Sequence, residues 1–235
     1  MPLGKNTPKL IFKLILGIIL QVAILGTLLF LPAGTFRWWR AWVFLGVYSV
    51  IGIVATAALF PGHQDLLEER FKVFHQKDQP LADKIILVML IAIFLGIFVF
   101  IPLDIFRYHL LGRPGHLISA AGLAMFLLGF WINYLALREN PFAAPVIKHI
   151  TERRQRVIDT GVYAVVRHPM YAGAIPLFIG IPLWLESYAA ALLASAVFII
   201  LIARIHLEEE FLKRELEGYD AYKERVRYRL IPYIW

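Results

Sequence analysis

Two polar stretches interrupt the apolar second half of the chain. The first, TGVYAVVRHPMYAG at residues 160–173, places Arg167 and His168 directly before a proline. Proline disfavours helical geometry at the residue before it but suits the first turn of a helix, so we expect a helix to begin at Pro169. The first backbone N–H groups of a helix carry partial positive charge. The stretch therefore predicts either a site for a carboxylate-bearing ligand or a basic helix end that anchors to lipid.

The second stretch, RIHLEEEFLKRELEGYDAYKERV at residues 204–226, follows an apolar run. Arg204 and Glu208 are four residues apart, so they share one face of a helix at the edge of the membrane. Ionisable side chains at such depth are costly to bury and indicate function, and we expect both to point toward the first stretch. Two further pairs at the same spacing are interpreted as ion pairs of a solvated helix: Glu209 with Lys213 and Glu210 with Arg214.

The composition is that of an integral membrane protein. Of the 235 residues, 60% are hydrophobic and 17% are charged, and the mean hydropathy is +0.68. A typical soluble domain is closer to half apolar and a quarter charged. We therefore predict an all-α, polytopic membrane protein that forms a single membrane domain over residues 1–235.

Apolar runs position the two polar stretches. A helix that crosses a bilayer core needs roughly 20 apolar residues. By this measure we predict about six transmembrane helices, at 10–31, 41–60, 85–106, 117–137, a shorter 171–185, and 188–205. Only Glu186 and Ser187 separate the last two, which predicts a tight helical hairpin. The fifth run contains glycines and prolines, and irregular backbone at membrane depth is tolerated only beside protein or a polar cavity. The hairpin is therefore expected next to the site.

Two other segments are interpreted as membrane-surface features. The segment 61–83 is polar, and the apolar spacing in DLLEERFKVF predicts a short amphipathic helix on the membrane surface. Trp38, Trp39 and Trp42 flank the second predicted helix, where indole rings favour the headgroup layer, so we interpret them as interfacial anchors.

The basic residues predict the orientation of the chain. Cytoplasmic loops carry an excess of lysine and arginine, so both termini and the site are expected in the cytoplasm, with a final cytoplasmic helix after the hairpin. A basic rim beside anionic lipid also accounts for the net charge of +7, and no nucleic-acid partner is predicted. All but four of the 24 lysines and arginines fall on the side of the termini, the exceptions being Arg37, Arg40, Arg107 and Arg113.

Several kinds of site are excluded because the residues they need are missing. The chain has no cysteine, which excludes disulfides, thiolate metal sites and a cysteine nucleophile. It contains neither GxGxxG nor GxxxxGK[ST], so no recognisable Rossmann or P-loop phosphate site is encoded. No two histidines are three or four residues apart, and we predict no metal site. No GxSxG elbow for a serine nucleophile occurs.

The order of motifs resembles a known family. GVYAVVRHPMYAG, then an Arg-x-x-x-Glu in RIHLEEEFL, then YDAYKERVRYRLIPYI are similar to the C-terminal half of the isoprenylcysteine carboxyl methyltransferase and phospholipid methyltransferase superfamily. These are integral membrane methyltransferases. The resemblance covers residues 140–235, while the first 130 residues are alike only in being hydrophobic helices. The apolar runs place four N-terminal transmembrane helices in 1–137, and the resemblance implies a methyltransferase-like, cofactor-binding part in 138–235.

The resemblance also implies a cofactor and a set of site residues. S-adenosylmethionine would be the methyl donor, held in a cytoplasm-facing pocket. Arg204 would bind the acceptor, and Arg204 and Glu208 are the expected catalytic residues. At Gln155 and Arg156 the family often has His-Thr or Gly-His, a departure from its pattern. The implied donor-binding residues are Gln155, Arg156, Val157, Ile158, Tyr163, His168, Pro169, Met170, Tyr171 and Glu208.

The expected reaction is methylation of a lipophilic or membrane-delivered acceptor, most like that of protein-S-isoprenylcysteine carboxyl O-methyltransferase. A sulfonium methyl is already activated, so displacement by a carboxylate or thiolate needs mainly alignment and removal of water. An amine must first lose a proton and gains nothing from an arginine, so Arg204 favours an anionic acceptor. The alternatives are N-methylation of a phospholipid or amine, S-methylation of a small thiol, an NADPH-dependent membrane reductase, and a non-enzymatic membrane protein.

Overall fold

The computed structural model describes residues 7–71, 80–143 and 155–235, and all the regular structure in these residues is helical. This confirms the all-α prediction. Two short irregular helices, η1 (Asp104–Tyr108) and η3 (Gly161–Ala164), join longer elements. The α-helices are α1 (Thr7–Ala33), α2 (Trp39–Leu59), α3 (Gln64–Arg70), α4 (Leu81–Leu103), α5 (His116–Glu139), α6 (Pro169–Trp184), α7 (Tyr188–Ser195), α8 (Val197–Glu215) and α9 (Tyr219–Arg225).

The long helices match the apolar runs of the sequence. Five segments of the described chain are long and apolar enough to cross a membrane: Thr7–Ala33, Trp39–Leu59, Leu81–Tyr108, His116–Glu139 and Tyr188–Glu215. The shorter apolar helix α6 corresponds to the predicted fifth run. These helices confirm a polytopic membrane protein, while the count of six crossings stays a prediction.

Helix α8 extends further than the apolar run that predicted it. We expected the last membrane helix to end near Ile205, but α8 continues to Glu215. The added residues are mostly leucine, glutamate, lysine and arginine, which have high helix propensity, so the loss of hydrophobicity does not end the helix. The extension carries Glu208 and Glu209 beyond the apolar part of the bundle on a rigid element.

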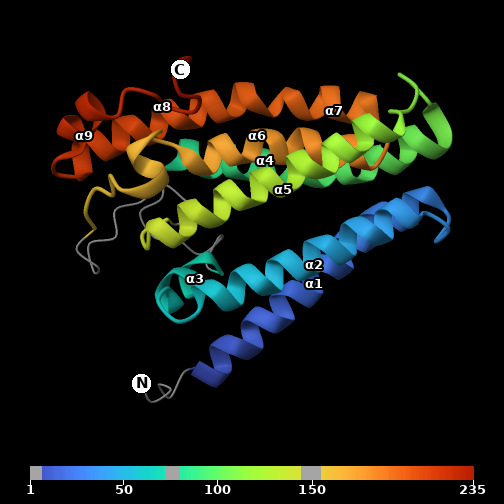
Figure 1. The fold of residues 1–235 in the computed structure, drawn as a ribbon, viewed down its shortest axis with the longest axis horizontal. Helices are drawn as coiled ribbons and strands as arrows, with labels where there is room; N and C mark the ends of the chain where they lie inside the picture. The colour runs from blue at the N-terminus through green and yellow to red at the C-terminus, as the bar shows by residue number, and fades with distance from the viewer. Residues whose placement is uncertain (1–6, 72–79, 144–154) are drawn as a thin grey trace.

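The helices form an elongated bundle whose two ends differ (Figure 1). α1 and α2 make an antiparallel pair along one side, and α1 also packs against α4. α5 and α6 make the most extensive helix pair, and α7 and α8 follow each other along α4. The start of α1 and the short helices α3 and α9 all lie at one end of the bundle (Figure 1).

Four glycines bring the backbones of α5 and α6 into direct contact. A Cβ atom added at Gly129 would lie 2.5 Å from the carbonyl oxygen of Gly173, and one added at Gly180 would lie 2.4 Å from that of Gly122. Real Cβ atoms do not approach so closely, so any larger residue would push the helices apart. Small residues at helix contacts are typical of membrane proteins, where close packing drives association. This contact fixes the position of α6, and therefore of the polar stretch before it.

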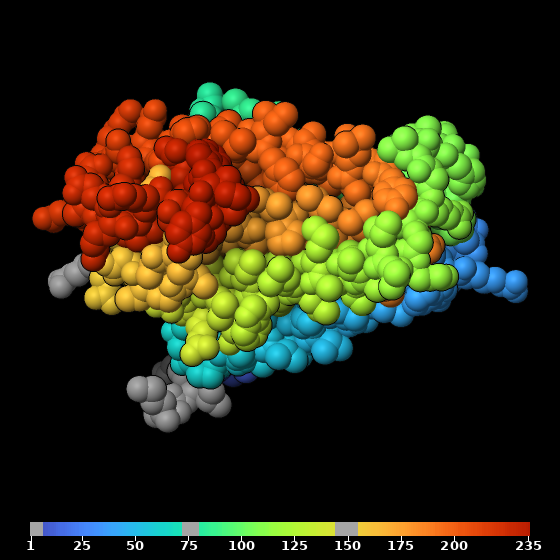
Figure 2. Space-filling model, turned by 45° about the horizontal axis from the view of Figure 1, so that its top comes forward, coloured from blue at the N-terminus to red at the C-terminus, as the bar shows by residue number. Residues whose placement is uncertain are grey.

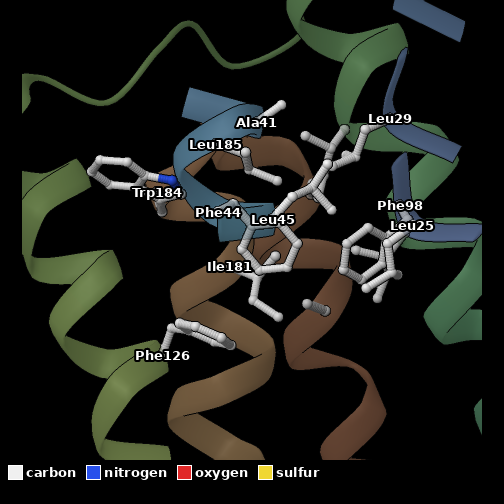
Figure 3. Close-up of a cluster of buried hydrophobic side chains, with 14 of the residues drawn as sticks. Leu25, Leu29, Ala41, Phe44, Leu45, Phe98, Phe126, Ile181, Trp184 and Leu185 are labelled. Carbon is white, nitrogen blue, oxygen red and sulfur yellow. The ribbon is translucent and has the colours of Figure 1, made fainter. Parts of the chain in front are cut away.

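A cluster of buried apolar side chains joins the two sides of the bundle (Figure 3). Phe44 of α2, Phe98 of α4 and Phe126 of α5 are at most 1% exposed, and the Phe44 ring centroid lies 5.7 Å from that of Phe98 and 5.5 Å from that of Phe126. Ile181 and Leu185 reach the same cluster from the end of α6. The core thereby connects α2 to the α6 hairpin.

One of the three predicted tryptophan anchors belongs to the core instead. Trp38 is 5% exposed and packs edge-on against Phe106, with ring centroids 5.3 Å apart. The prediction for Trp38 was wrong because sequence position near a helix start does not determine which way a ring points. Trp39 and Trp42 are exposed, as expected of interfacial side chains.

The tight connection between α6 and α7 lies at the end of the bundle opposite α3 and α9 (Figure 1). Glu186 has a left-handed backbone (φ 71°), and its Oε1 lies 3.0 Å from Nε of Arg40. Ser187 caps α7 by accepting a hydrogen bond from the Ala190 N–H at 3.0 Å, and its hydroxyl donates to Asp104 Oδ2 at 2.6 Å. These contacts tie the hairpin to α2 and η1, so the turn is held on both sides.

Candidate functional site

A cavity of about 300 Å³ lies among α3, α5, α6, α8 and α9 and the segments that join them. Every site residue predicted from the sequence lines it. The structure therefore brings together residues from three separate parts of the chain, although the role of each residue stays a prediction. The predicted residues on its wall are Gln155, Arg156, Val157, Ile158, Tyr163, His168, Pro169, Met170, Tyr171, Arg204 and Glu208.

The polar stretch before α6 has the local geometry that its sequence predicts. α6 begins at Pro169, and His168 precedes it outside the helical region, with φ −123° and ψ 62°. The 3₁₀ helix η3 ends at Ala164, so residues 165–168 form a short non-helical link. Both expectations for the proline are met: the residue before it is not helical, and the helix begins at the proline itself.

The residues after α9 fold back onto this link. The backbone N–H of Arg167 donates to Tyr228 O, and that of His168 donates to Arg229 O, each at 2.9 Å. The Arg167 side chain donates through Nη1 to the carbonyl oxygens of Val226 (2.8 Å) and Arg227 (2.9 Å). In Figure 2 the red C-terminal residues lie against the golden segment that precedes α6. Much of the polarity of the stretch therefore serves to hold the C-terminal segment.

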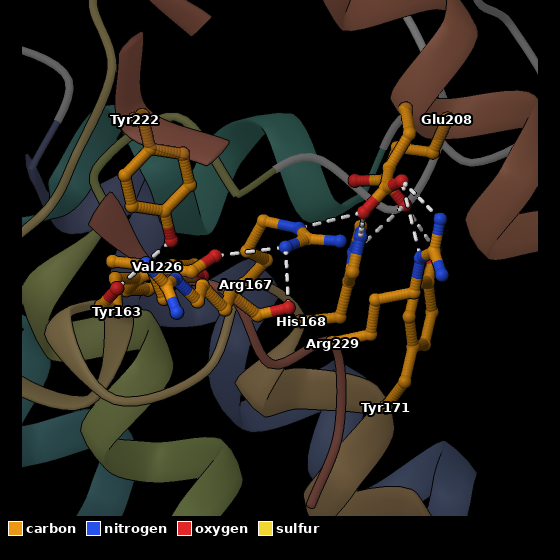
Figure 4. A network of polar contacts seen from close by, with 10 residues as sticks. Tyr163, Arg167, His168, Tyr171, Glu208, Tyr222, Val226 and Arg229 are labelled. Carbon is orange, nitrogen blue, oxygen red and sulfur yellow. Dashed lines mark hydrogen bonds and ion pairs between the residues drawn. The ribbon is translucent and has the colours of Figure 1, made fainter. Parts of the chain in front are cut away.

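Glu209 is the centre of a buried ion network at the same place. Its partners Arg167, His168 and Arg229 are labelled in Figure 4. Its Oε1 accepts from Arg167 Nε at 2.8 Å, and its Oε2 accepts from Arg229 Nη2 at 3.1 Å. His168 Nε2 lies 3.2 Å from Oε1. Glu209 is only 4% exposed, so its interpretation as a solvated side chain was wrong.

The reason for that error is the fold of the C-terminal segment. The spacing of Glu209 and Lys213 does not show whether that helix face is covered. The segment after α9 covers it and brings Arg229 to Glu209. On the neighbouring face of the helix, one residue further along, Glu210 and Arg214 remain exposed and are 3.9 Å apart, which confirms the solvated pair predicted there.

Glu208 faces the cavity together with two aromatic rings. The Tyr171 hydroxyl donates to Glu208 Oε2 at 2.6 Å, and His168 Nδ1 lies 3.9 Å from the same oxygen. The rings of His168 and Tyr171 stack, with centroids 5.6 Å apart. A carboxylate close to aromatic rings favours a positively charged ligand group, such as an ammonium or a sulfonium.

Arg204 is paired with a residue that the sequence did not single out. Its Nη2 lies 3.2 Å from Oδ1 of Asp83 in the first turn of α4. Asp83 is fully buried and Arg204 is 6% exposed. The Arg204 guanidinium also lies 5.9 Å from the ring centroid of Tyr171. The charge of Arg204 is therefore balanced within the protein. Asp83 was missed because it falls in the polar segment between predicted helices.

Two buried tyrosines contribute to the wall beside η3. The hydroxyl of Tyr222 in α9 donates to the carbonyl oxygen of Tyr163 at 2.8 Å. Burial raises the pKa of both Tyr163 and Tyr222 well above the ordinary value, so both phenols are neutral at physiological pH. Tyr222 lines the cavity but lay outside the predicted set, because the matched motif marks it only as part of a helix.

Helix α3 closes another side of the cavity. It occupies part of the predicted amphipathic segment 61–83, whose residues 72–79 lie outside the described chain. His63 Nε2 lies 2.8 Å from the carbonyl oxygen of Arg138, and Arg70 Nη1 donates to that of Ala143 at 3.2 Å. Arg70 lines the cavity, so the segment belongs to the site. Its place on the membrane surface stays a prediction.

Across the described residues, no three His, Cys, Asp or Glu side chains are grouped closely enough to hold a metal ion. What the cavity does contain is a carboxylate, aromatic rings, several arginines and an apolar wall. Such a set of groups suits an organic ligand that carries both charges and an apolar ring system.

Two comparisons with known proteins gave matches to methyltransferases. Residues 117–217 match the family model described as phospholipid methyltransferase. The fold is similar to that of the eukaryotic intramembrane Ras methyltransferase ICMT (isoprenylcysteine carboxyl methyltransferase). The TM-score is 0.51 with 19% identity, over 90% of this chain and 75% of that chain. A search of curated protein sequences gave no significant match.

The apolar helices define an integral membrane protein, and the two matches are to methyltransferases. Both matches agree with the resemblance that the sequence motifs predicted. The matched residues run from α5 to the end of α8 and include most of the cavity wall. Arg70, Asp83 and Tyr222 lie outside them.

Proposed function

We propose that the protein transfers the methyl group of S-adenosylmethionine to a lipophilic acceptor that reaches the cavity from the membrane. The observation that carries this proposal is the convergence of all the motif-derived residues on one cavity, most of whose wall lies in the residues that match the phospholipid methyltransferase model. A volume of about 300 Å³ is at the lower end of the range of small-molecule sites. It suits a ligand of nucleoside size.

The groups on the wall fit the chemical groups of this donor. Glu208 would bind its ammonium or balance its sulfonium, with His168 at the same carboxylate. Tyr163 and Tyr171 would cover the adenosine or the sulfonium, and Val157 and Ile158 provide apolar wall. When bound, the donor supplies an activated methyl group, so the protein needs to align the acceptor and exclude water rather than provide a strong base. Alignment of this kind can contribute around 7 to 11 kcal/mol.

Arg204 is proposed to contact the acceptor. Because Asp83 already balances its charge, Arg204 would act by directing hydrogen bonds rather than as an isolated cation. The first candidate acceptor is a carboxylate attached to a lipophilic group, as the ICMT-like motifs imply. The second is an amine headgroup, which is favoured by the match to the phospholipid methyltransferase model. The pairing of Arg204 with Asp83 also favours it, because the positive charge of Arg204 is already balanced.

The site is further proposed to face the cytoplasm, together with both termini. This rests on the asymmetry of the lysines and arginines in the sequence and on the positive-inside rule. Helices α3 and α9 and the start of α1 share the end of the bundle that contains the cavity residues (Figure 1), which supports the proposal.

Calorimetric titration of the detergent-purified protein with S-adenosylhomocysteine, and separately with NADPH, tests the function. We expect S-adenosylhomocysteine alone to bind, and Glu208→Ala to abolish its binding. Glu210→Ala is the matched control, because Glu210 is exposed and pairs with Arg214. Binding of NADPH instead, or of neither cofactor, would overturn the proposal.

The acceptor would then be identified by transfer of a radiolabelled methyl group. The panel needs a prenylcysteine, a phosphatidylethanolamine in detergent, and a lipophilic thiol, because these present the three candidate nucleophiles. We expect one of these classes to accept the label well above the others. Loss of label transfer in Glu208→Ala would show that the methylation takes place in the cavity.

A further inference from the structure

Four arginines line the cavity: Arg70, Arg156, Arg167 and Arg204. Their charges are balanced to different extents. Arg167 is paired with Glu209, and Arg204 with Asp83. Arg156 is exposed to solvent, where water screens its charge. Arg70 is half-buried, so its pairing matters most for the charge of the cavity.

Arg70 has a neutral partner. In the described chain, its side chain donates through Nη1 to the carbonyl oxygen of Ala143 at 3.2 Å, and no ion pair between Arg70 and a described carboxylate occurs. A guanidinium has five N–H donors, and this contact with the described chain uses one side of the group. Burial lowers the pKa of Arg70 from its ordinary value, as expected for a charge that its surroundings do not fully compensate.

We propose that Arg70 binds the carboxylate of the methyl donor, so that α3 forms one wall of the donor site. This rests on the proposed function. Arginine binds carboxylates through two parallel N–H···O bonds, and S-adenosylmethionine carries one carboxylate. The other buried arginines of the cavity already bind carboxylates of the protein, and Glu208 would repel an anion. Arg70 is therefore the side chain best suited to this part of the ligand.

The position of α3 supports this assignment. His63 and Arg70 hold the helix to backbone carbonyl groups at and beyond the end of α5. Leu66 and Leu67 of α3 are buried, so the helix is packed into the protein rather than projecting from it. α3 lies before the residues that match the family model, which begin at 117. The inference thus gives a binding role to a segment outside the matched region.

The test compares two ligands by calorimetry: S-adenosylhomocysteine and its decarboxylated analogue, which keeps the amine, the thioether and the adenosine. The native protein is expected to bind the complete ligand about 10- to 100-fold more tightly, the range for a hydrogen-bonded charge. Arg70→Gln should lose this preference by weakening the complete ligand while leaving the analogue unchanged. Arg70→Lys should retain part of the preference.

Arg214→Gln is the control, because Arg214 is 76% exposed and pairs with Glu210. It should behave as the native protein. Equal affinity of the native protein for the two ligands, or equal weakening of both by Arg70→Gln, would overturn the assignment. If the native protein bound neither ligand, the proposed function itself would fail, and the role of Arg70 with it. Thermal melting of each variant in detergent establishes that it is folded.

Discussion

The Nη2 atom of Arg204 lies 3.2 Å from Oδ1 of Asp83, although the two residues are more than a hundred positions apart in the chain. Both side chains are buried. The pair connects the start of α4 to the part of α8 that lines the cavity, so it joins the N-terminal helices to the proposed site. It also means that the charge of Arg204 cannot be considered separately from that of Asp83.

The stability of the protein should depend on this pair as a unit. Breaking a buried ion pair by removing one partner typically costs about 3 to 5 kcal/mol, because the other charge is left uncompensated. We therefore expect Arg204→Ala to melt at a clearly lower temperature than the native protein. The double variant Asp83→Asn/Arg204→Ala should recover part of the loss. Thermal melting in detergent measures this, and additive effects of the two changes would contradict it.

The same double variant separates the acceptor from the donor. If Arg204 orients the acceptor, its loss should raise the KM for the acceptor far more than the Kd for S-adenosylhomocysteine. Steady-state kinetics and calorimetry on one preparation give the two values. An equal loss in both would refute the proposed division of roles between Arg204 and Glu208.

Tyr171→Phe tests the wall on the donor side. The change removes the hydroxyl that donates to Glu208 at 2.6 Å but keeps the ring. Hydrogen bonds to charged groups contribute about 1.5 to 3 kcal/mol, so we expect the affinity for S-adenosylhomocysteine to fall about tenfold or more. Tyr48→Phe is the control, because it removes a hydroxyl that donates to Gln21, outside the cavity, at 3.0 Å. Equal affinities of the two variants would show that the hydroxyl of Tyr171 is not needed.

Glu209→Gln should loosen the C-terminal segment. The change removes the charge that Arg167 and Arg229 share, and these arginines would remain close together without an anion. We expect a fall in melting temperature and faster proteolysis after α9, whereas Glu210→Gln should leave both unchanged. If the two variants behaved alike, the burial of Glu209 would have no bearing on the fold of this segment.

The contact between α5 and α6 should not tolerate even one added carbon atom. Gly129→Ala would place a methyl group 2.5 Å from Gly173 O, and overpacking of this kind typically costs about 1 to 3 kcal/mol. Gly46→Ala in α2 is the control, because its Cβ would meet no atom within 4 Å. Alanine also suits a helix interior better than glycine, so we expect Gly46→Ala to be neutral or stabilising when both variants are melted in detergent.

Local features of the sequence were sufficient to predict most of the helices and the helix face that carries the site. The helix start at Pro169 follows from the conformational limits of proline, which act on neighbouring residues. The long helices follow from apolar runs, because a bilayer requires uninterrupted apolar length. Arg204 and Glu208 were placed on one helix face by their spacing alone, and both line the cavity. These predictions succeeded because each depends on interactions within a few residues.

The charge environment of the site was decided by contacts between distant segments. The partner of Arg204 comes from α4, and the burial of Glu209 depends on the segment after α9. Arg70, whose described partner is the backbone carbonyl of Ala143, comes from α3. Trp38 likewise turned into the core rather than toward the membrane surface. Whether a charge or a ring is exposed depends on what covers it. Patterns along the sequence therefore predict which helices form and which residues share a face, whereas contacts between distant segments determine which charges are paired.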